Sequence, residues 1–167
     1  NNYNSYPIFT TKQFIDTNKN SNELNFLKLS IDDLSQSFLE KVKNDKTVVL
    51  VLETENLAGM AEQRRVFFEL IEKGMASPVI IKRNYIDIKF EDLQLHSSTD
   101  FGALLIDGFG DGVWISVNEI KSENTGTYVK SFINKSETKE KIVNRLLFNI
   151  LQAARQRISK TEYIACP

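Results

Sequence analysis

The segment from residue 47 to residue 53, Thr-Val-Val-Leu-Val-Leu-Glu, is apolar on both faces of an extended chain. Strands with this pattern are typical of the interior of a parallel sheet, where both faces are covered. An amphipathic helical pattern follows over residues 57–75, and a second apolar strand follows at residues 78–82. This strand–helix–strand order predicts a parallel sheet with right-handed crossovers.

Other segments continue this alternation of strands and helices, and residues 118–136 are a polar segment between two of them. We expect further strands at residues 25–30, 102–107, 113–117 and 163–165, helices over residues 31–42 and 137–156, and a helical turn at residues 91–95. The predicted fold class is therefore α/β, with a mostly parallel sheet of about five to six strands and flanking helices. Its arrangement is either partly TIM-barrel-like or an open layer. Residues 1–22 are rich in Asn, Ser, Thr and Lys and are predicted to be a linker or poorly ordered lead, with an edge strand at residues 7–9.

Composition excludes several classes of function. The 167 residues are enough for one domain with a core, and the formal net charge of −1 argues against a nucleic-acid-binding surface. The single cysteine excludes an internal disulfide framework and suits a reducing compartment. The longest apolar runs, such as residues 47–52, are too short to span a membrane.

A glycine-rich turn, Asp-Gly-Phe-Gly-Asp-Gly at residues 107–112, lies between two apolar segments. The backbone N–H groups of Gly108 and Gly110 are candidates for binding a phosphate, but a tight structural connection explains the turn better, because no helix follows directly and two acidic residues would repel an anion. Asp107 and Asp111 are candidates for a hard cation, although capping of the turn's own N–H groups is the simpler explanation.

The other candidate site residues follow predicted strands or lie in a polar segment. Lys82 and Arg83 are the best anion-binding candidates, against the alternative of plain surface charge. Glu53 and Glu55 end a central strand, where barrel enzymes place their chemistry, although helix capping explains at least one of them better. His96 is the only histidine, and no partner for nucleophilic catalysis is readable beside it.

The last two residues are Cys166 and Pro167. Cys-Pro is frequent in iron–sulfur ligand runs, because proline turns the chain beside the cluster. On the cysteine alone, a buried thiol that acts as a small hydrophobe is the favoured alternative. The position of this pair predicts that the sequence is a segment of a larger protein that stops where a cluster-binding domain begins.

Three segments together carry a resemblance to a known enzyme family. They are Gly-Ala-Leu-Leu-Ile-Asp-Gly-Phe-Gly-Asp-Gly at residues 102–112, Phe-Asn-Ile-Leu-Gln-Ala-Ala-Arg-Gln-Arg at residues 148–157, and Lys-Thr-Glu-Tyr-Ile-Ala-Cys-Pro at residues 160–167. In this combination the chain resembles (E)-4-hydroxy-3-methylbut-2-enyl diphosphate synthase, in the three-domain form found in plants and some bacteria. The resemblance is strong over residues 101–167 and weaker over residues 25–100.

The resemblance implies an organisation. Residues 23–160 correspond to the α/β middle domain inserted between a barrel and an iron–sulfur domain, and residues 161–167 to the start of that iron–sulfur domain. Cys166 matches the first cysteine of a Cys-Pro-x-Cys run, which in the family binds a [4Fe–4S] cluster. One thiolate cannot hold a cluster, so none is expected in this chain alone.

The resemblance also implies a function for the complete enzyme of which this chain would be a segment, called the parent here. That enzyme is an iron–sulfur oxidoreductase of non-mevalonate isoprenoid (terpenoid) biosynthesis. It converts 2-C-methyl-D-erythritol 2,4-cyclodiphosphate to hydroxymethylbutenyl diphosphate with electrons from ferredoxin or flavodoxin, in the bacterial cytoplasm. The expected partners are the other domains of the same polypeptide, with a homodimer of the parent also allowed. The middle domain is expected to be structural and inactive by itself. The alternative is a diphosphate-binding domain that uses Lys82, Arg83, Gly108 and Gly110.

Overall fold

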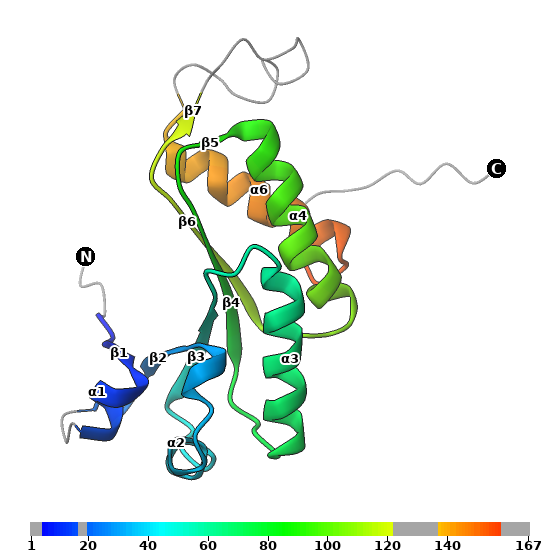
Figure 1. The fold of residues 1–167 in the computed structure, drawn as a ribbon. Coiled ribbons are helices and arrows are strands. Elements are labelled where there is room, and N and C mark those ends of the chain that lie inside the picture. Colours follow the sequence, from blue (N-terminus) through cyan, green and yellow to red (C-terminus); the bar gives the residue numbers. More distant parts are fainter. Residues whose placement is uncertain (1–4, 17–19, 122–136, 158–167) are drawn as a thin grey trace. The chain divides into compact units, whose positions relative to one another are not determined.

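Parallel strands and intervening helices alternate in the computed structural model, which describes residues 5–16, 20–121 and 137–157 (Figure 1). A five-stranded sheet has the strand order β1-β2-β3-β4-β6. Its members are β1 (Ile8–Thr10), β2 (Asn25–Leu29), β3 (Val48–Glu53), β4 (Val79–Tyr85) and β6 (Gly112–Val117). The fold class predicted from the sequence is confirmed, and the sheet forms no closed barrel among the described residues, since β1 and β6 are its two edges.

The register of the sheet aligns the apolar strands. β1 pairs with β2, β2 with β3, and β3 with β4, all in parallel, with Leu27 opposite Leu50 and Glu53 opposite Lys82. The N–H of Asp111 donates to the carbonyl of Val79 (2.7 Å) beside the last strand. Because adjacent strands run in the same direction, their carboxyl ends lie along one edge of the sheet.

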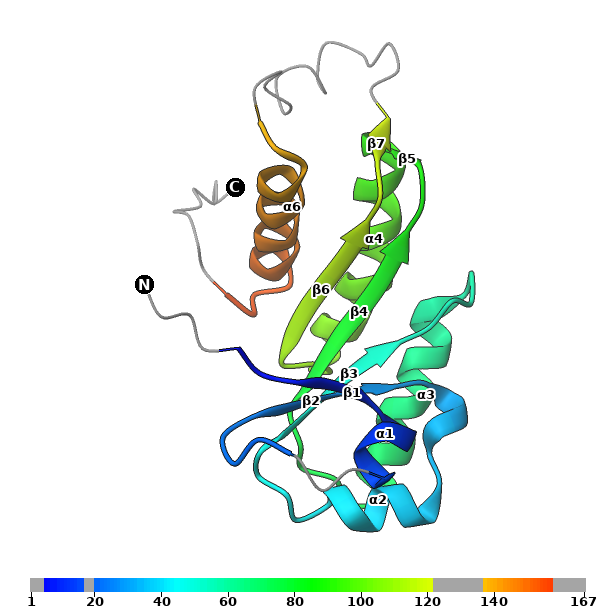
Figure 2. The same ribbon diagram turned by 90° about the vertical axis from the view of Figure 1, so that its left-hand side faces the viewer.

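The chain divides into two compact units, which share β4 and β6. The first unit comprises Asn1–Arg83 and Phe109–Trp114, and it contains α1 (Thr11–Asp16), α2 (Gln36–Val42) and α3 (Gly59–Glu72). The strands β1, β2, β3 and β4 follow one another in the sheet in chain order, and right-handed crossovers, the usual connection between parallel strands, would place the intervening helices on one face. Figure 2 shows α1 and α2 beneath β1 and β2, and α3 beside β3. The core between them holds fully buried side chains of both layers: Phe14, Leu27, Leu29, Phe38, Leu50, Leu52 and Val66.

The helix expected over residues 31–42 is divided in the structure. A 3-10 turn, η1 (Ile31–Asp33), precedes α2, and a capping box joins Ser30 and Asp33 around it. The Oγ of Ser35 accepts the N–H of Phe38 (3.4 Å) and begins α2. Serine side chains compete for backbone N–H groups in this way, so each serine starts a new helical segment.

The second unit comprises Asn84–Gly108 and Ile115–Pro167. It contains α4 (Phe90–Ile106), α6 (Lys139–Ala153) and a two-stranded parallel sheet of β5 (Ile88–Lys89) and β7 (Ile120–Lys121). Helices α4 and α6 contact each other. Phe90 and Ile142 form a small buried cluster with Ile120 packed against it, so that both helices and β7 share one core.

The strand predicted at residues 102–107 was wrong. The helical turn expected at residues 91–95 is confirmed, but it belongs to one long helix, α4, which runs from Phe90 to Ile106 and includes the segment assigned to the strand. Buried residues recur along it with helical spacing: Leu93, Ser97, Phe101, Leu104 and Leu105. A short apolar run such as Ala-Leu-Leu-Ile is by itself compatible with a strand or a helix. The helical spacing of the buried residues over the whole segment distinguishes the two.

The first 22 residues contain ordered elements as well as polar chain. Residues 8–16 form β1 and α1, and the ring of Phe14 is buried. The strand predicted at residues 163–165 lies outside the described residues. None of the described helices combines the length and the apolar character that crossing a membrane requires.

Candidate functional site

In the first unit, charged and polar side chains gather at the carboxyl end of β3 and on the neighbouring part of β4. Parallel α/β sheets usually place their functional residues at this edge. Glu53 is the last residue of β3, and Lys82 lies opposite it on β4. Thr54 and Arg83 follow directly, and the chain then turns into α3.

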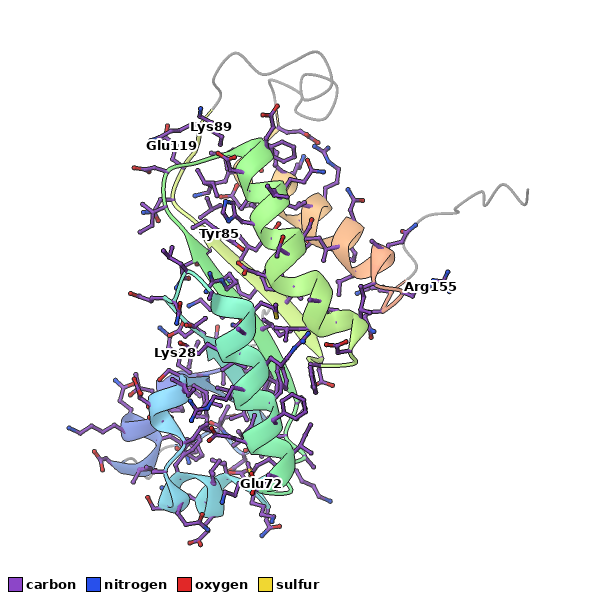
Figure 3. All side chains as sticks on the ribbon, turned by 45° about the vertical axis from the view of Figure 1, so that its right-hand side comes forward. Lys28, Glu72, Tyr85, Lys89, Glu119 and Arg155 are labelled. Carbon is purple, nitrogen blue, oxygen red and sulfur yellow. The ribbon has the colours of Figure 1, made fainter. Side chains whose placement is uncertain are left out.

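Lys82 is held between a carboxylate and an aromatic ring. Its Nζ lies 2.5 Å from Oε2 of Glu53 and 4.9 Å from the ring centroid of Trp114. The other oxygen of Glu53 lies 3.9 Å from Nζ of Lys28, whose side chain is 40% exposed against 8% for Lys82. The buried ammonium is thereby neutralised by its neighbours, and Lys28 (labelled in Figure 3) carries the more accessible positive charge.

Arg83 is also buried and donates to backbone carbonyls. Its Nη1 donates to the carbonyl of Thr54 (3.0 Å), and its Nη2 donates to the carbonyl of Asn56 (3.1 Å). The guanidinium lies directly against Gly59, where an added Cβ would be 2.1 Å from Nη1. Arg83 therefore fixes the loop between β3 and α3, and the close approach requires glycine at position 59.

The same loop is closed by Glu62, in the first turn of α3. Its carboxylate accepts hydrogen bonds from the hydroxyl of Thr54 and from Nδ2 of Asn56 (3.0 Å). These two donors, in that order, hold the pKa of Glu62 below its ordinary value, with a further contribution from the charge of Arg83. Within the loop, the N–H of Asn56 donates to Oγ1 of Thr54 (3.0 Å), so the loop is rigidly held.

Gln63 of α3 forms hydrogen bonds with both β3 and β4. It is fully buried, and its Nε2 donates to the carbonyls of Leu52 (3.0 Å) and Lys82 (3.1 Å). Among the described residues its Oε1 has no hydrogen-bond partner. Sequence reasoning missed Gln63, although a glutamine among the apolar positions of an amphipathic helix was a readable signal.

The glycine-rich turn lies elsewhere on the sheet. Gly110 has a φ of 88°, and a Cβ added there would lie 2.6 Å from Cδ1 of Ile81. The carboxylate of Asp111 accepts the N–H of Val79 (2.8 Å), so this aspartate caps the amino end of β4. Asp111, next to Gly110, thus lies beside the first residue of β4, whereas Lys82 is opposite the last residue of β3.

Gly108 belongs to the second unit and has a φ of 82° with no atom near an added Cβ. The assignment of Lys82, Arg83, Gly108 and Gly110 to substrate binding remains a prediction. An anion at the carboxyl edge would have to compete with Glu53 for Lys82.

In the second unit the structure reveals a buried polar pair that the sequence reasoning missed. The phenol of Tyr85 donates to Oδ2 of Asp100 (2.8 Å), and both side chains are buried. Asp100 lies on the same face of α4 as Leu93, Ser97 and Leu104, a period hidden by the mistaken strand. His96 is exposed on α4.

The described residues supply no ligand set for a metal. No group of three or more His, Cys, Asp or Glu side chains gathers within residues 5–16, 20–121 and 137–157. Cys166, the predicted cluster ligand, lies outside these residues.

Comparison with known proteins supports the resemblance stated from the sequence. The chain is 38% identical over 98% of its length to a protein named 4-hydroxy-3-methylbut-2-en-1-yl diphosphate synthase (flavodoxin) from Parabacteroides distasonis, and 31% identical over 98% of its length to the protein of the same name from Phocaeicola vulgatus. It is 33% identical over 77% of its length to the ferredoxin form, a chloroplastic protein of Arabidopsis thaliana.

The chain spans 24% of the length of each of the first two relatives and 16% of the third. No family model matches it. No solved structure matches it either. The resemblance to these synthases is thus confirmed for a segment that makes up 16–24% of the length of these relatives.

Proposed function

We propose that this chain is the middle domain of a 4-hydroxy-3-methylbut-2-en-1-yl diphosphate synthase and acts as a scaffold for the catalytic domains. The observation that carries this proposal is the coverage: nearly the whole chain aligns with a segment that makes up 24% of the synthases from Parabacteroides distasonis and Phocaeicola vulgatus. The α/β fold with a mostly parallel sheet agrees with the expected middle domain.

The pairing of charges at the carboxyl edge supports a structural role. Lys82 is neutralised by Glu53, Arg83 donates to two backbone carbonyls, and Glu62 accepts two hydrogen bonds from the same loop. Buried charges that are satisfied in this way brace a loop and are costly to separate. We therefore expect no catalytic residue among the described side chains.

In this proposal the complete polypeptide converts 2-C-methyl-D-erythritol 2,4-cyclodiphosphate to hydroxymethylbutenyl diphosphate in the bacterial cytoplasm, with flavodoxin or ferredoxin as electron donor. A [4Fe–4S] cluster supplies the two electrons when bound, and Cys166 would be one of its ligands in the longer polypeptide. The residues described here position the neighbouring domains.

Anaerobic reconstitution of this chain with iron and sulfide tests the scaffold role. We expect a cooperatively folded, colourless protein that does not convert the cyclodiphosphate. The complete polypeptide that contains this sequence, treated in parallel, is expected to gain cluster absorbance and to convert the substrate with reduced flavodoxin. A stable cluster on the 167-residue chain, or no conversion by the complete polypeptide, would contradict the proposal.

A second candidate is a diphosphate site at the carboxyl edge, favoured by the accessible ammonium of Lys28 beside the Glu53–Lys82 pair. Calorimetric titration of the chain with the cyclodiphosphate distinguishes the two. Binding that is lost in Lys82→Ala and kept in Lys46→Ala, which lies before β3 at the opposite end of the strand, would favour this candidate. The scaffold proposal predicts no heat of binding.

A further inference from the structure

Helix α3 exposes two large apolar side chains one turn apart. Phe68 and Ile71 are each 58% exposed, although the same helix buries Val66, Phe67 and Leu70 against the sheet. Residues three apart on a helix are neighbours on its surface. The outer side of α3 therefore presents one continuous apolar strip in the first unit.

The ring of Phe68 is held in place by a second aromatic residue. Phe109 stacks on Phe67 with ring centroids 5.0 Å apart, and it meets Phe68 edge-on at 5.5 Å. A braced aromatic side chain loses little conformational freedom when a partner covers it, which is typical of the anchors that dominate protein interfaces.

Opposite charges lie on either side of this strip along the helix axis. Arg65 lies three residues before Phe68 and Glu72 lies four residues after it, near the end of α3 (Figure 3). The side chain of Arg65 is 70% exposed, and its Nε lies 3.0 Å from Oε1 of Glu69 within the same helix. Glu72 is exposed.

This charge order is self-complementary under a two-fold axis. Arg65 and Glu72 are seven positions apart, which corresponds to about 10 Å along the helix. When a second α3 lies antiparallel across Phe68 and Ile71, each Arg65 meets Glu72 of the partner subunit, and Phe68 meets the partner's Ile71. Isologous contacts of this kind use the same surface on both subunits.

We propose that the apolar strip of Phe68 and Ile71, together with Arg65 and Glu72 on either side of it, is an interface between two copies of this chain. In this interface the two α3 helices lie antiparallel. The contact area of a single helix pair is small, so the dimer is weak and forms reversibly. The proposal is independent of the scaffold function, because it concerns self-association and needs neither cluster nor substrate.

Sedimentation equilibrium of the 167-residue chain at about 10–500 µM, a range suited to a weak interface, tests the proposal. We expect the average mass to rise with concentration above the 19.1 kDa of one chain. Phe68→Glu and Ile71→Glu should each weaken association at least about tenfold, because they bury a charge in the strip. Ile71→Glu has no ring contact to lose, so it keeps the test valid if Phe68→Glu unfolds.

Charge exchange makes the test specific for the antiparallel pair. Arg65→Glu alone and Glu72→Arg alone place like charges together and should each weaken association, whereas the double variant should restore it. Leu95→Glu, at an exposed leucine of α4, is the matched control and should leave association unchanged. A chain that stays monomeric throughout the range, or a double variant whose self-association is not restored, overturns the proposal. The strip would then be a surface that another part of a longer polypeptide covers.

Discussion

The contact between Arg83 and Gly59 is a single-residue constraint with a direct test. In Gly59→Ala the new methyl group would occupy the position of the guanidinium, which is held by two backbone carbonyls. We expect the free energy of unfolding to fall by about 1–3 kcal/mol, as in other overpacked sites. Urea unfolding followed by circular dichroism measures the change.

Gly102 provides the matched control for this substitution. It also lies within a helix, but no atom lies within 4 Å of an added Cβ. Gly102→Ala should therefore raise stability by about 0.5–1 kcal/mol, since glycine is a poor helix former. Equal effects at the two positions would show that Arg83 moves away from Gly59 at little cost.

Arg155 has an unusual backbone conformation at the end of α6. Its φ is 56°, and the N–H of Gln156 donates to the carbonyl of Leu151 (2.9 Å), which closes a Schellman motif (Figure 3 labels Arg155). Glycine is preferred at this position because it has no Cβ. Arg155→Gly should raise the free energy of unfolding by about 0.5–1 kcal/mol in a urea titration. Arg155→Ala keeps the Cβ, and a similar gain from it would refute the backbone explanation.

At the scale of elements, the loop that joins β3 to α3 should make stability depend on pH. The pKa of Glu62 is below its ordinary value of 4.5 in the folded chain, chiefly because of the Thr54 hydroxyl and then the Asn56 amide. The folded state therefore binds this proton less readily than the unfolded state. The resulting stabilisation is complete above about pH 4.5 and is lost as the pH falls through the lowered pKa.

Urea unfolding between about pH 6 and about pH 3 checks this dependence. In Glu62→Gln the loss of stability on acidification should be smaller than in the wild type, because one titrating group is gone. Thr54→Val removes the principal donor and should raise the pKa of Glu62 towards its ordinary value. If both variants lose stability with pH as the wild type does, Glu62 is not responsible.

Elements with a clear hydrophobic pattern over their whole length were predictable from the sequence. Segments whose pattern fits either a strand or a helix were not. The apolar run in β3 and the helical period of α6 were each assigned within two or three residues of the observed bounds. The segment that became α4 was divided because Gly102 and the apolar run after it resemble the start of a strand. Ser97 and Asp100 are polar residues on the buried face of α4, and they hid its helical period.

The candidate site was predictable in position but not in detail. The sequence indicated Lys82 and Arg83 because they come at the end of the strand expected over residues 78–82. In the structure β4 continues to Tyr85, so both residues lie within it, and Lys82 is opposite Glu53 at the end of β3. Their partners are carbonyls of residues 54 and 56 and a carboxylate on the neighbouring strand. Such contacts depend on strand register and loop closure, which no local sequence pattern specifies.

At the scale of the whole molecule, β4 and β6 each run through both compact units. Because two strands are shared, we expect the units to unfold in one cooperative transition.

Trp114, the only tryptophan, lies in the first unit and reports on it by fluorescence, whereas the buried Leu104 of α4 lies in the second. Leu104→Ala should cost about 2–5 kcal/mol and should shift the urea midpoint of Trp114 fluorescence as far as that of circular dichroism. Leu50→Ala, in the core of the first unit, is the matched control and should shift both signals. A fluorescence midpoint that does not move in Leu104→Ala would show that the units unfold separately.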